Sequence, residues 1–140
     1  MLLIIACFAM VMLVMIVGMR MYYVRVDEMK TNRINPQSIA TSAQAASQLK
    51  NTQAADNFKN LFEVPVLFYA LVAVALAVGD VPFWLVIGAW SFVALRYIHS
   101  FIQCTYNKVM HRFYAFVSSF LLINAMWIGF IVSLSGRFSG

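Results

Sequence analysis

Residues 61–78 read LFEVPVLFYALVAVALAV, a run of eighteen residues with a single charged side chain, Glu63. A helix needs about 20 mostly apolar residues to cross the hydrocarbon core of a bilayer. Three other stretches have the same character. We therefore expect an all-α, four-transmembrane-helix bundle in a single domain, residues 1–140, with spans at about residues 2–20, 57–78, 82–104 and 113–134.

The composition supports a membrane protein and argues against a soluble one. Of the 140 residues, 63% are hydrophobic and only 11% are charged, whereas about 25% are charged in a typical soluble domain. So few charges cannot cover so much apolar surface in water. We interpret the first apolar stretch as a retained helix, because it has no positively charged start, is long for a signal sequence and is followed by no small-residue cleavage site.

The ten basic residues divide unequally between the two sides of such a bundle. Cytoplasmic loops of membrane proteins carry an excess of Lys and Arg, so we expect the first and third connections to be cytoplasmic and both termini to be external. The charge is then explained by topology, and no basic patch with interleaved aromatics remains to bind nucleic acid. Flanking the first and third connections are Arg20, Arg25, Lys30, Arg33, Lys50, Lys59, Arg96, Lys108 and Arg112, and on the other side lies Arg137.

Several kinds of site lack their sequence signatures. Cys7 and Cys104 stand alone in apolar stretches, so neither a disulfide framework nor a metal site is indicated. The chain also has no GxSxG, no glycine-rich phosphate loop and no HExxH. Ordinary hydrolase, nucleotide-binding and metalloprotease functions therefore have no support.

Polar residues inside the spans form two stripes near the cytoplasmic side. Such residues are costly in hydrocarbon and often functional. By helical spacing each stripe occupies one face, and we expect Glu63 of the first to lie close to Arg96 of the second as an ion pair. Pro65 follows Glu63 and should bend the second span. The first stripe comprises Asp56, Asn60 and Glu63, and the second Arg96, His99 and Gln103, continued by Tyr106.

Two interpretations of the polar residues remain open. Intramembrane polar side chains often hold helices or subunits together without any catalysis. The alternative is a pocket for a small anionic or zwitterionic ligand, with the acid binding an amine and the Arg and Lys residues binding carboxylates. The number of polar residues favours the pocket, since eight of them converge on the cytoplasmic end of the predicted bundle: Asn60, Glu63, Arg96, His99, Tyr106, Lys108, His111 and Arg112. A transporter is less well supported, because no repeated pattern of broken helices occurs.

Three segments together resemble the MAPEG family, the membrane-associated proteins in eicosanoid and glutathione metabolism, and its short bacterial members most. They are Asn60-Leu-Phe-Glu63-Val-Pro65 at the second span, Arg96-Tyr-Ile-His99-Ser in the third, and Thr105-Tyr-Asn-Lys-Val-Met-His-Arg112 before the fourth. The resemblance covers most of the chain. It implies a homotrimer in the bacterial inner membrane, with glutathione held between subunits and a lipophilic electrophile or lipid hydroperoxide arriving from the bilayer.

The resemblance also implies roles for individual residues. Arg112 would be catalytic, because a guanidinium beside the glutathione sulfur stabilises the nucleophilic thiolate. The predicted glutathione-binding residues are Asn60, Glu63, Arg96, His99, Tyr106 and Lys108, and no metal is expected. Asp56 and Gln103 depart from the family pattern, since the eukaryotic enzymes carry Arg and Tyr there. Some relatives bind lipid or partner proteins without catalysis, so a non-catalytic binding protein is the alternative function.

Overall fold

Helices make up nearly all of the computed structural model, which describes residues 1–138. No strand occurs in that range. Four segments are long and apolar enough to cross a membrane, with α3 and α4 together forming one of them, which confirms the predicted all-α bundle of four spans. The elements are α1 (Leu2–Thr31), the 3₁₀ helix η1 (Pro36–Ile39), α2 (Ser42–Gln48), α3 (Gln53–Asn60), α4 (Val64–Val78), α5 (Phe83–Cys104) and α6 (Val109–Phe138).

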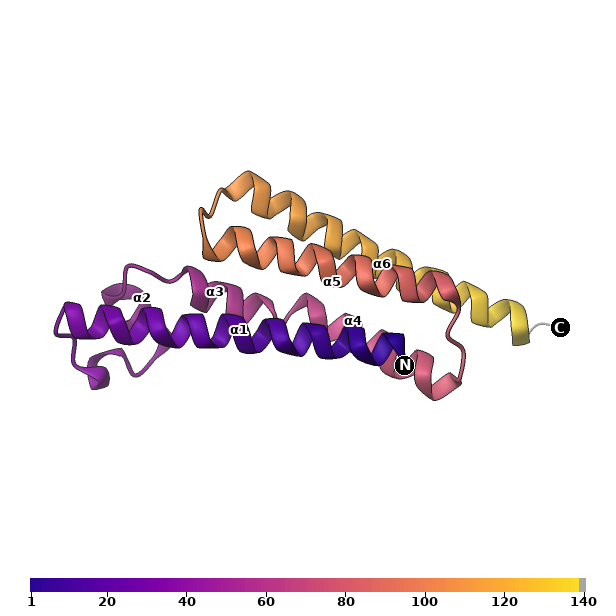
Figure 1. Cartoon of the computed structure of the whole chain (residues 1–140), viewed down its shortest axis with the longest axis horizontal. Coiled ribbons are helices and arrows are strands. Elements are labelled where there is room, and N and C mark those ends of the chain that lie inside the picture. Colours follow the sequence, from indigo (N-terminus) through magenta and orange to yellow (C-terminus); the bar gives the residue numbers. More distant parts are fainter. Residues whose placement is uncertain (139–140) are drawn as a thin grey trace.

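The helices run alongside one another and place both termini toward the same end (Figure 1). The segment between α1 and α3 and the turn between α5 and α6 lie at the opposite end. In the bundle α1 contacts α3, α4 and α5, while α6 contacts α4 and α5. This arrangement agrees with an even number of spans, and which end faces the cytoplasm stays a prediction.

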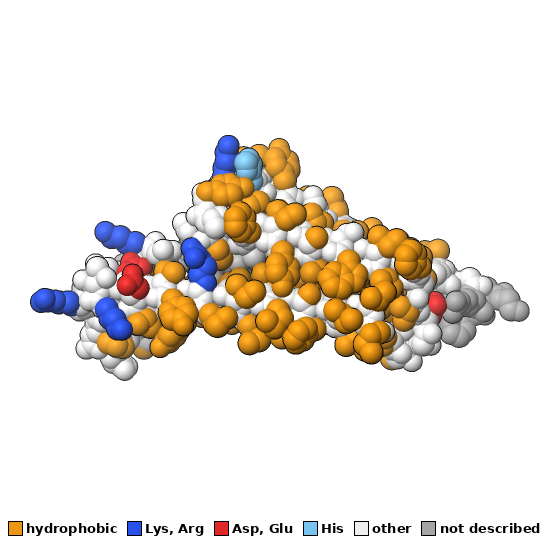
Figure 2. Space-filling model, in the orientation of Figure 1, with side chains coloured by type: hydrophobic (Ala, Val, Ile, Leu, Met, Phe, Trp, Pro, Cys, Tyr) orange, Lys and Arg blue, Asp and Glu red, His pale blue; other side chains and the backbone are white. Residues whose placement is uncertain are grey.

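The outer surface is apolar along the body and charged at one end. Figure 2 shows hydrophobic side chains over the bundle, while most of the visible Lys, Arg, Asp and Glu side chains gather at the end with the α1–α2 connection. Large side chains such as Phe8, Leu121 and Ile128 are more than 60% exposed. Lipid is the solvent that suits such a surface. The side chain of Arg137, predicted to be on the other side, lies outside the described part of the chain.

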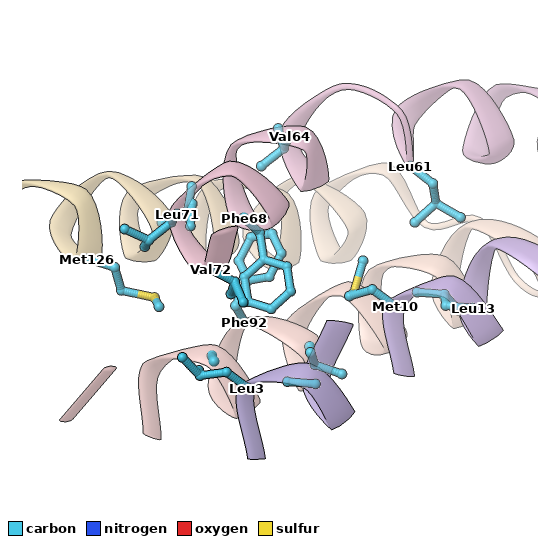
Figure 3. Close-up of a cluster of buried hydrophobic side chains, with 14 of the residues drawn as sticks. Leu3, Met10, Leu13, Leu61, Val64, Phe68, Leu71, Val72, Phe92 and Met126 are labelled. Carbon is cyan, nitrogen blue, oxygen red and sulfur yellow. The ribbon is translucent and has the colours of Figure 1, made fainter. Parts of the chain in front are cut away.

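Apolar side chains fill the centre of the bundle, with a few hydrogen bonds between helices. The rings of Phe68 in α4 and Phe92 in α5 stack with their centroids 4.9 Å apart (Figure 3). Tyr97 donates a hydrogen bond to the carbonyl oxygen of Ala9 at 2.8 Å. Trp127 donates one to a carbonyl oxygen of α4 at 3.1 Å. Interhelical hydrogen bonds of this kind contribute about 0.6–2 kcal/mol each in a membrane.

The second span is interrupted rather than smoothly bent. Residues 61–63 form turns, so α3 ends at Asn60 and α4 begins at Val64. Pro65 then lies in the first turn of α4, where the missing N–H would have had no partner within that helix. The bend predicted from Pro65 is therefore present as a complete break, and the proline starts a helix instead of kinking one.

The polar segment before α3 is anchored to the end of α1. The carboxylate of Glu28 accepts hydrogen bonds from the backbone N–H groups of Lys50, at 2.6 Å, and Asn51, at 3.2 Å. Within the segment, Thr41 and Gln44 form a capping box at the start of α2, a local pattern that stabilises a helix N-terminus. The anchor fixes where α3 enters the bundle, and α3 carries the first residues of the cavity described next.

Candidate functional site

A cavity of about 490 Å³ lies between α3, the start of α4, α5 and α6, near the end of the bundle that carries the α5–α6 turn. This volume is within the range of small-molecule sites, about 300–1,000 Å³. Its wall is mixed in polarity and includes both signs of charge. The lining residues are Asp56, Lys59, Asn60, Glu63, His99, Gln103, Val109, Arg112, Phe113 and Phe116.

One wall of the cavity carries the first predicted polar stripe. Asp56 and Asn60 come from α3, and Glu63 is the residue immediately before α4. The helix break does not separate them, because all three still line the same cavity. Asp56 accepts a hydrogen bond from Thr52 at 3.1 Å. Two carboxylates and an amide thus face the same space.

Arg96 lies behind this wall and is fully buried. Its Nη2 donates a hydrogen bond to the side-chain oxygen of Asn60 and another, at 3.3 Å, to the Asn60 carbonyl oxygen. Because α3 ends at Asn60, the guanidinium is placed at the negative end of a helix dipole. Asn60 is therefore its hydrogen-bond partner, and the ion pair expected with Glu63 is not formed among the described residues.

The remaining donors of Arg96 are not used by the described residues. Nε and Nη1 are buried and have no hydrogen-bond partner there. The guanidinium carbon lies 6.0 Å from the centre of the Phe116 ring, within the range of a cation–π contact. Burying a guanidinium is costly unless it is hydrogen-bonded, so Asn60 and Phe116 supply the local stabilisation.

His99 connects α5 to the beginning of α6. Its Nδ1 lies 3.1 Å from the carbonyl oxygen of Arg112, and its Nε2 lies 3.0 Å from the side-chain oxygen Oε1 of Gln103. A carbonyl oxygen only accepts, so Nδ1 must carry the proton. The imidazole therefore fixes the backbone of the residue that the family resemblance makes catalytic.

Arg112 lies in the first turn of α6 and lines the cavity. Its Nη1 donates a hydrogen bond to the side-chain oxygen of Asn107 at 3.0 Å. Asn107 has φ 45°, the left-handed conformation that Asn adopts more readily than most residues. This turn reverses the chain between α5 and α6. The hydrogen bond to Asn107 holds the guanidinium of Arg112 at the wall of the cavity.

Two predicted binding residues lie apart from the cavity. Tyr106 is exposed, and its hydroxyl lies 3.1 Å from Nδ1 of His111. Lys108 precedes α6 and does not line the cavity either. The structure thus brings together Asn60, Glu63, His99 and Arg112, with Arg96 behind them, and leaves Tyr106 and Lys108 outside.

Some lining residues were not among the predicted site residues. Lys59 was counted among the charges that set the topology and was not a predicted glutathione-binding residue. Val109, Phe113 and Phe116 are apolar, yet with Arg112 they follow the spacing of one helical face. Their pattern could have shown that Arg112 shares its face with an apolar wall, which suits a ligand with both polar and apolar parts.

The cavity has the groups to hold a zwitterion and to stabilise an anion. Asp56 and Glu63 can bind ammonium groups, and Lys59 and Arg112 can bind carboxylates or a thiolate. Among the described residues no group of three or more His, Cys, Asp or Glu side chains could hold a metal ion. The charged side chains of the cavity therefore suit binding of a zwitterion and stabilisation of an anion.

Comparison with family models gives a match to the MAPEG family over residues 3–132. No curated protein and no solved structure matches the chain. The matched region contains every residue that lines the cavity.

Proposed function

Because the chain belongs to the MAPEG family, we propose that it is a membrane-bound, glutathione-dependent transferase or peroxidase acting on lipophilic electrophiles or lipid hydroperoxides. The observation that carries the proposal is the cavity of about 490 Å³ that combines Asn60, Glu63, His99 and Arg112 from three segments of the chain. The family includes glutathione transferases and peroxidases as well as non-catalytic members. The choice between an enzyme and a non-catalytic protein therefore rests on the residues of the cavity.

The tripeptide would bind along the polar wall. Glu63 is suited to the γ-glutamyl ammonium group and Asn60 to a peptide amide, while Lys59 is suited to a carboxylate. The phenyl rings of Phe113 and Phe116 supply an apolar side, against which the lipophilic co-substrate would lie. Holding both reactants in one cavity removes much of the entropic barrier to their reaction.

Arg112 would stabilise the reactive form of the thiol. A thiol with an ordinary pKa of about 8.5 is mostly protonated at neutral pH, and a nearby guanidinium favours the thiolate. In conjugation the thiolate attacks the electrophilic carbon, a C–S bond forms, and the leaving group departs with its electron pair. In peroxide reduction two glutathione molecules are oxidised to the disulfide while the hydroperoxide is reduced to an alcohol and water.

The assembly and location belong to the same proposal. We place the protein in the bacterial inner membrane as a homotrimer, with the first and third connections in the cytoplasm, where glutathione is available. The unequal distribution of basic residues supports this orientation.

Calorimetry and a conjugation assay test the proposed activity. Purified protein in detergent should bind glutathione at millimolar concentration and conjugate it to an electrophilic arene. Arg112→Ala should lower the rate about 100-fold, as loss of an oxyanion-stabilising donor does in other enzymes. Lys30→Ala, an exposed cation at the end of α1, should keep the wild-type rate. Absence of glutathione binding would reject the proposal.

A non-catalytic membrane protein that binds a lipid or a partner is the second candidate. It is favoured by Arg96, which donates its hydrogen bonds to Asn60 inside the subunit and does not line the cavity. Under this candidate Arg96→Ala destabilises the subunit and through it the oligomer in detergent, and no thiol chemistry is detected for any variant. Intact oligomers combined with lost glutathione binding would count against it.

A further inference from the structure

A second cavity lies on the opposite face of α5 from the polar site. His99 and Gln103 face the polar cavity, whereas Tyr97, Phe101 and Cys104 line a space of about 280 Å³ between α5 and α1. With about 100° between successive residues of a helix, these two sets lie on opposite sides. The second cavity is therefore independent of the proposed glutathione site.

The wall of this second cavity is apolar along its length and cationic at one end. From α1 it is lined by Leu13, Ile16, Val17 and Arg20, which span about 10 Å along the helix axis. Among the residues that the structure describes, Arg20 is the only charged one that lines this cavity. We call the apolar part of this cavity the trough. A trough with one guanidinium at its end is suited to an amphiphile that has a hydrocarbon tail and an anionic head group.

The depth of Arg20 places its side chain at the membrane surface. Arg20 lies eighteen residues after Leu2, the first residue of α1, which corresponds to about 27 Å of helix. The hydrocarbon core is about 30 Å thick. The apolar trough therefore runs inside the hydrocarbon, while the guanidinium reaches the level of the lipid head groups.

The guanidinium of Arg20 is held in position but not neutralised. Its Nη2 donates a hydrogen bond to the carbonyl oxygen of Cys104 at the end of α5, and within residues 1–138 no carboxylate pairs with it. None of the described residues that line the cavity is Asp or Glu. An arginine fork with free donors favours a phosphate, which it can bind through two parallel hydrogen bonds.

We propose that the cavity between α1 and α5 is a binding site for one anionic phospholipid. One acyl chain lies in the trough between Val17 and Phe101, and the phosphate binds the guanidinium of Arg20. The net negative charge of the head group distinguishes this lipid from a zwitterionic one, because the mouth of the site offers a cation and no carboxylate.

Native mass spectrometry of the detergent-solubilised protein tests the charge preference. Phosphatidylglycerol should bind more tightly than phosphatidylcholine with the same acyl chains. Arg20→Gln should weaken phosphatidylglycerol binding about tenfold, the size expected for one charge-assisted hydrogen bond, and leave phosphatidylcholine unchanged. Lys30→Gln removes the same charge from α1 away from the cavity and should change neither lipid. An unchanged phosphatidylglycerol preference in Arg20→Gln would overturn the proposal.

A variant that fills the trough tests the acyl-chain site without touching the charge. Ile16 is exposed and lines the cavity, so Ile16→Trp should fold and reduce binding of both lipids. Ile5→Trp places the same ring at another exposed position of α1, outside the cavity, and should bind lipid as the wild type does. If Arg20→Gln and Ile16→Trp instead alter only the oligomeric mass, the trough is covered by a second copy of the chain and the lipid site is rejected.

Discussion

Asn60 takes part in two contacts that compete for its side chain. It lines the polar cavity, and it also accepts hydrogen bonds from the buried guanidinium of Arg96. Removing the amide would leave the cation with only a backbone carbonyl and the Phe116 ring. Residues of this kind affect stability and binding together, so both must be measured.

We expect Asn60→Leu to lower the free energy of unfolding by about 1.5–3 kcal/mol, the usual cost of losing a hydrogen bond to a charged group. Reversible unfolding in mixed detergent measures this loss. Asn124→Leu is the matched control, because Asn124 is exposed and donates only to Phe120 of its own helix. Equal losses for the two substitutions would show that the contact between Asn60 and Arg96 adds no more stability than an exposed hydrogen bond does.

His99 provides a residue-scale prediction about turnover. His99→Phe keeps a ring of similar size but removes the hydrogen bonds to Arg112 and Gln103. If His99 positions Arg112, kcat for arene conjugation should fall about 10–100-fold, as expected for a small misplacement of a reacting group, with a smaller change in KM for glutathione. Gln103→Leu keeps the bond to Arg112 and should lose less. A change confined to KM would assign His99 to ligand binding alone.

At the scale of elements, the contact between α5 and α6 depends on a small residue. A Cβ added at Gly88 would approach Sδ of Met126 to 2.9 Å and two other atoms of that side chain to 3.1 Å. We expect Gly88→Ala to lower the free energy of unfolding by about 1 kcal/mol, the lower end of the cost of overpacking, because the flexible side chain of Met126 can shift. A Cβ added at Gly136 would meet no other atom within 4 Å, so Gly136→Ala should leave the free energy of unfolding unchanged or raise it slightly. Thermal unfolding of both variants in one detergent gives the comparison.

The elements themselves were largely predictable from hydropathy. The third span was placed at 82–104 and is Phe83–Cys104, because apolar residues end there sharply. The first and fourth helices extend beyond the predicted 2–20 and 113–134, since helices continue into polar sequence once they leave the lipid. The break before Val64 was predicted only as a bend, because a proline alone does not show whether a helix is kinked or restarted.

At the scale of the whole molecule, the predicted orientation can be measured by cysteine labelling. With Cys7 and Cys104 replaced by Ala, a membrane-impermeant maleimide should label Gln37→Cys from the cytoplasmic side only. Val81→Cys, between α4 and α5, should react only from the outside. Both positions are exposed, so a reversed pattern would mean that the distribution of basic residues misled the prediction.

The assembled site was predicted in part. Spacing along the second and third spans correctly indicated that Asn60, Glu63 and His99 could converge. It could not show that Arg96 turns to Asn60 rather than Glu63, because that choice depends on where α3 ends. Nor could it exclude Tyr106, whose place beyond the end of α5 follows from the turn.

The interruption at residues 61–63 also affects how the sequence can vary. A continuous helix rotates every later residue by about 100° when one residue is inserted, so an insertion would turn the packed face of α4 toward lipid. Three non-helical residues can absorb such a change, which leaves α4 packed on Phe92 while α3 keeps its own orientation. The two halves of this span can therefore vary independently, α3 within the limits set by the polar cavity and by its contacts with α1 and α5, and α4 within those set by the apolar core.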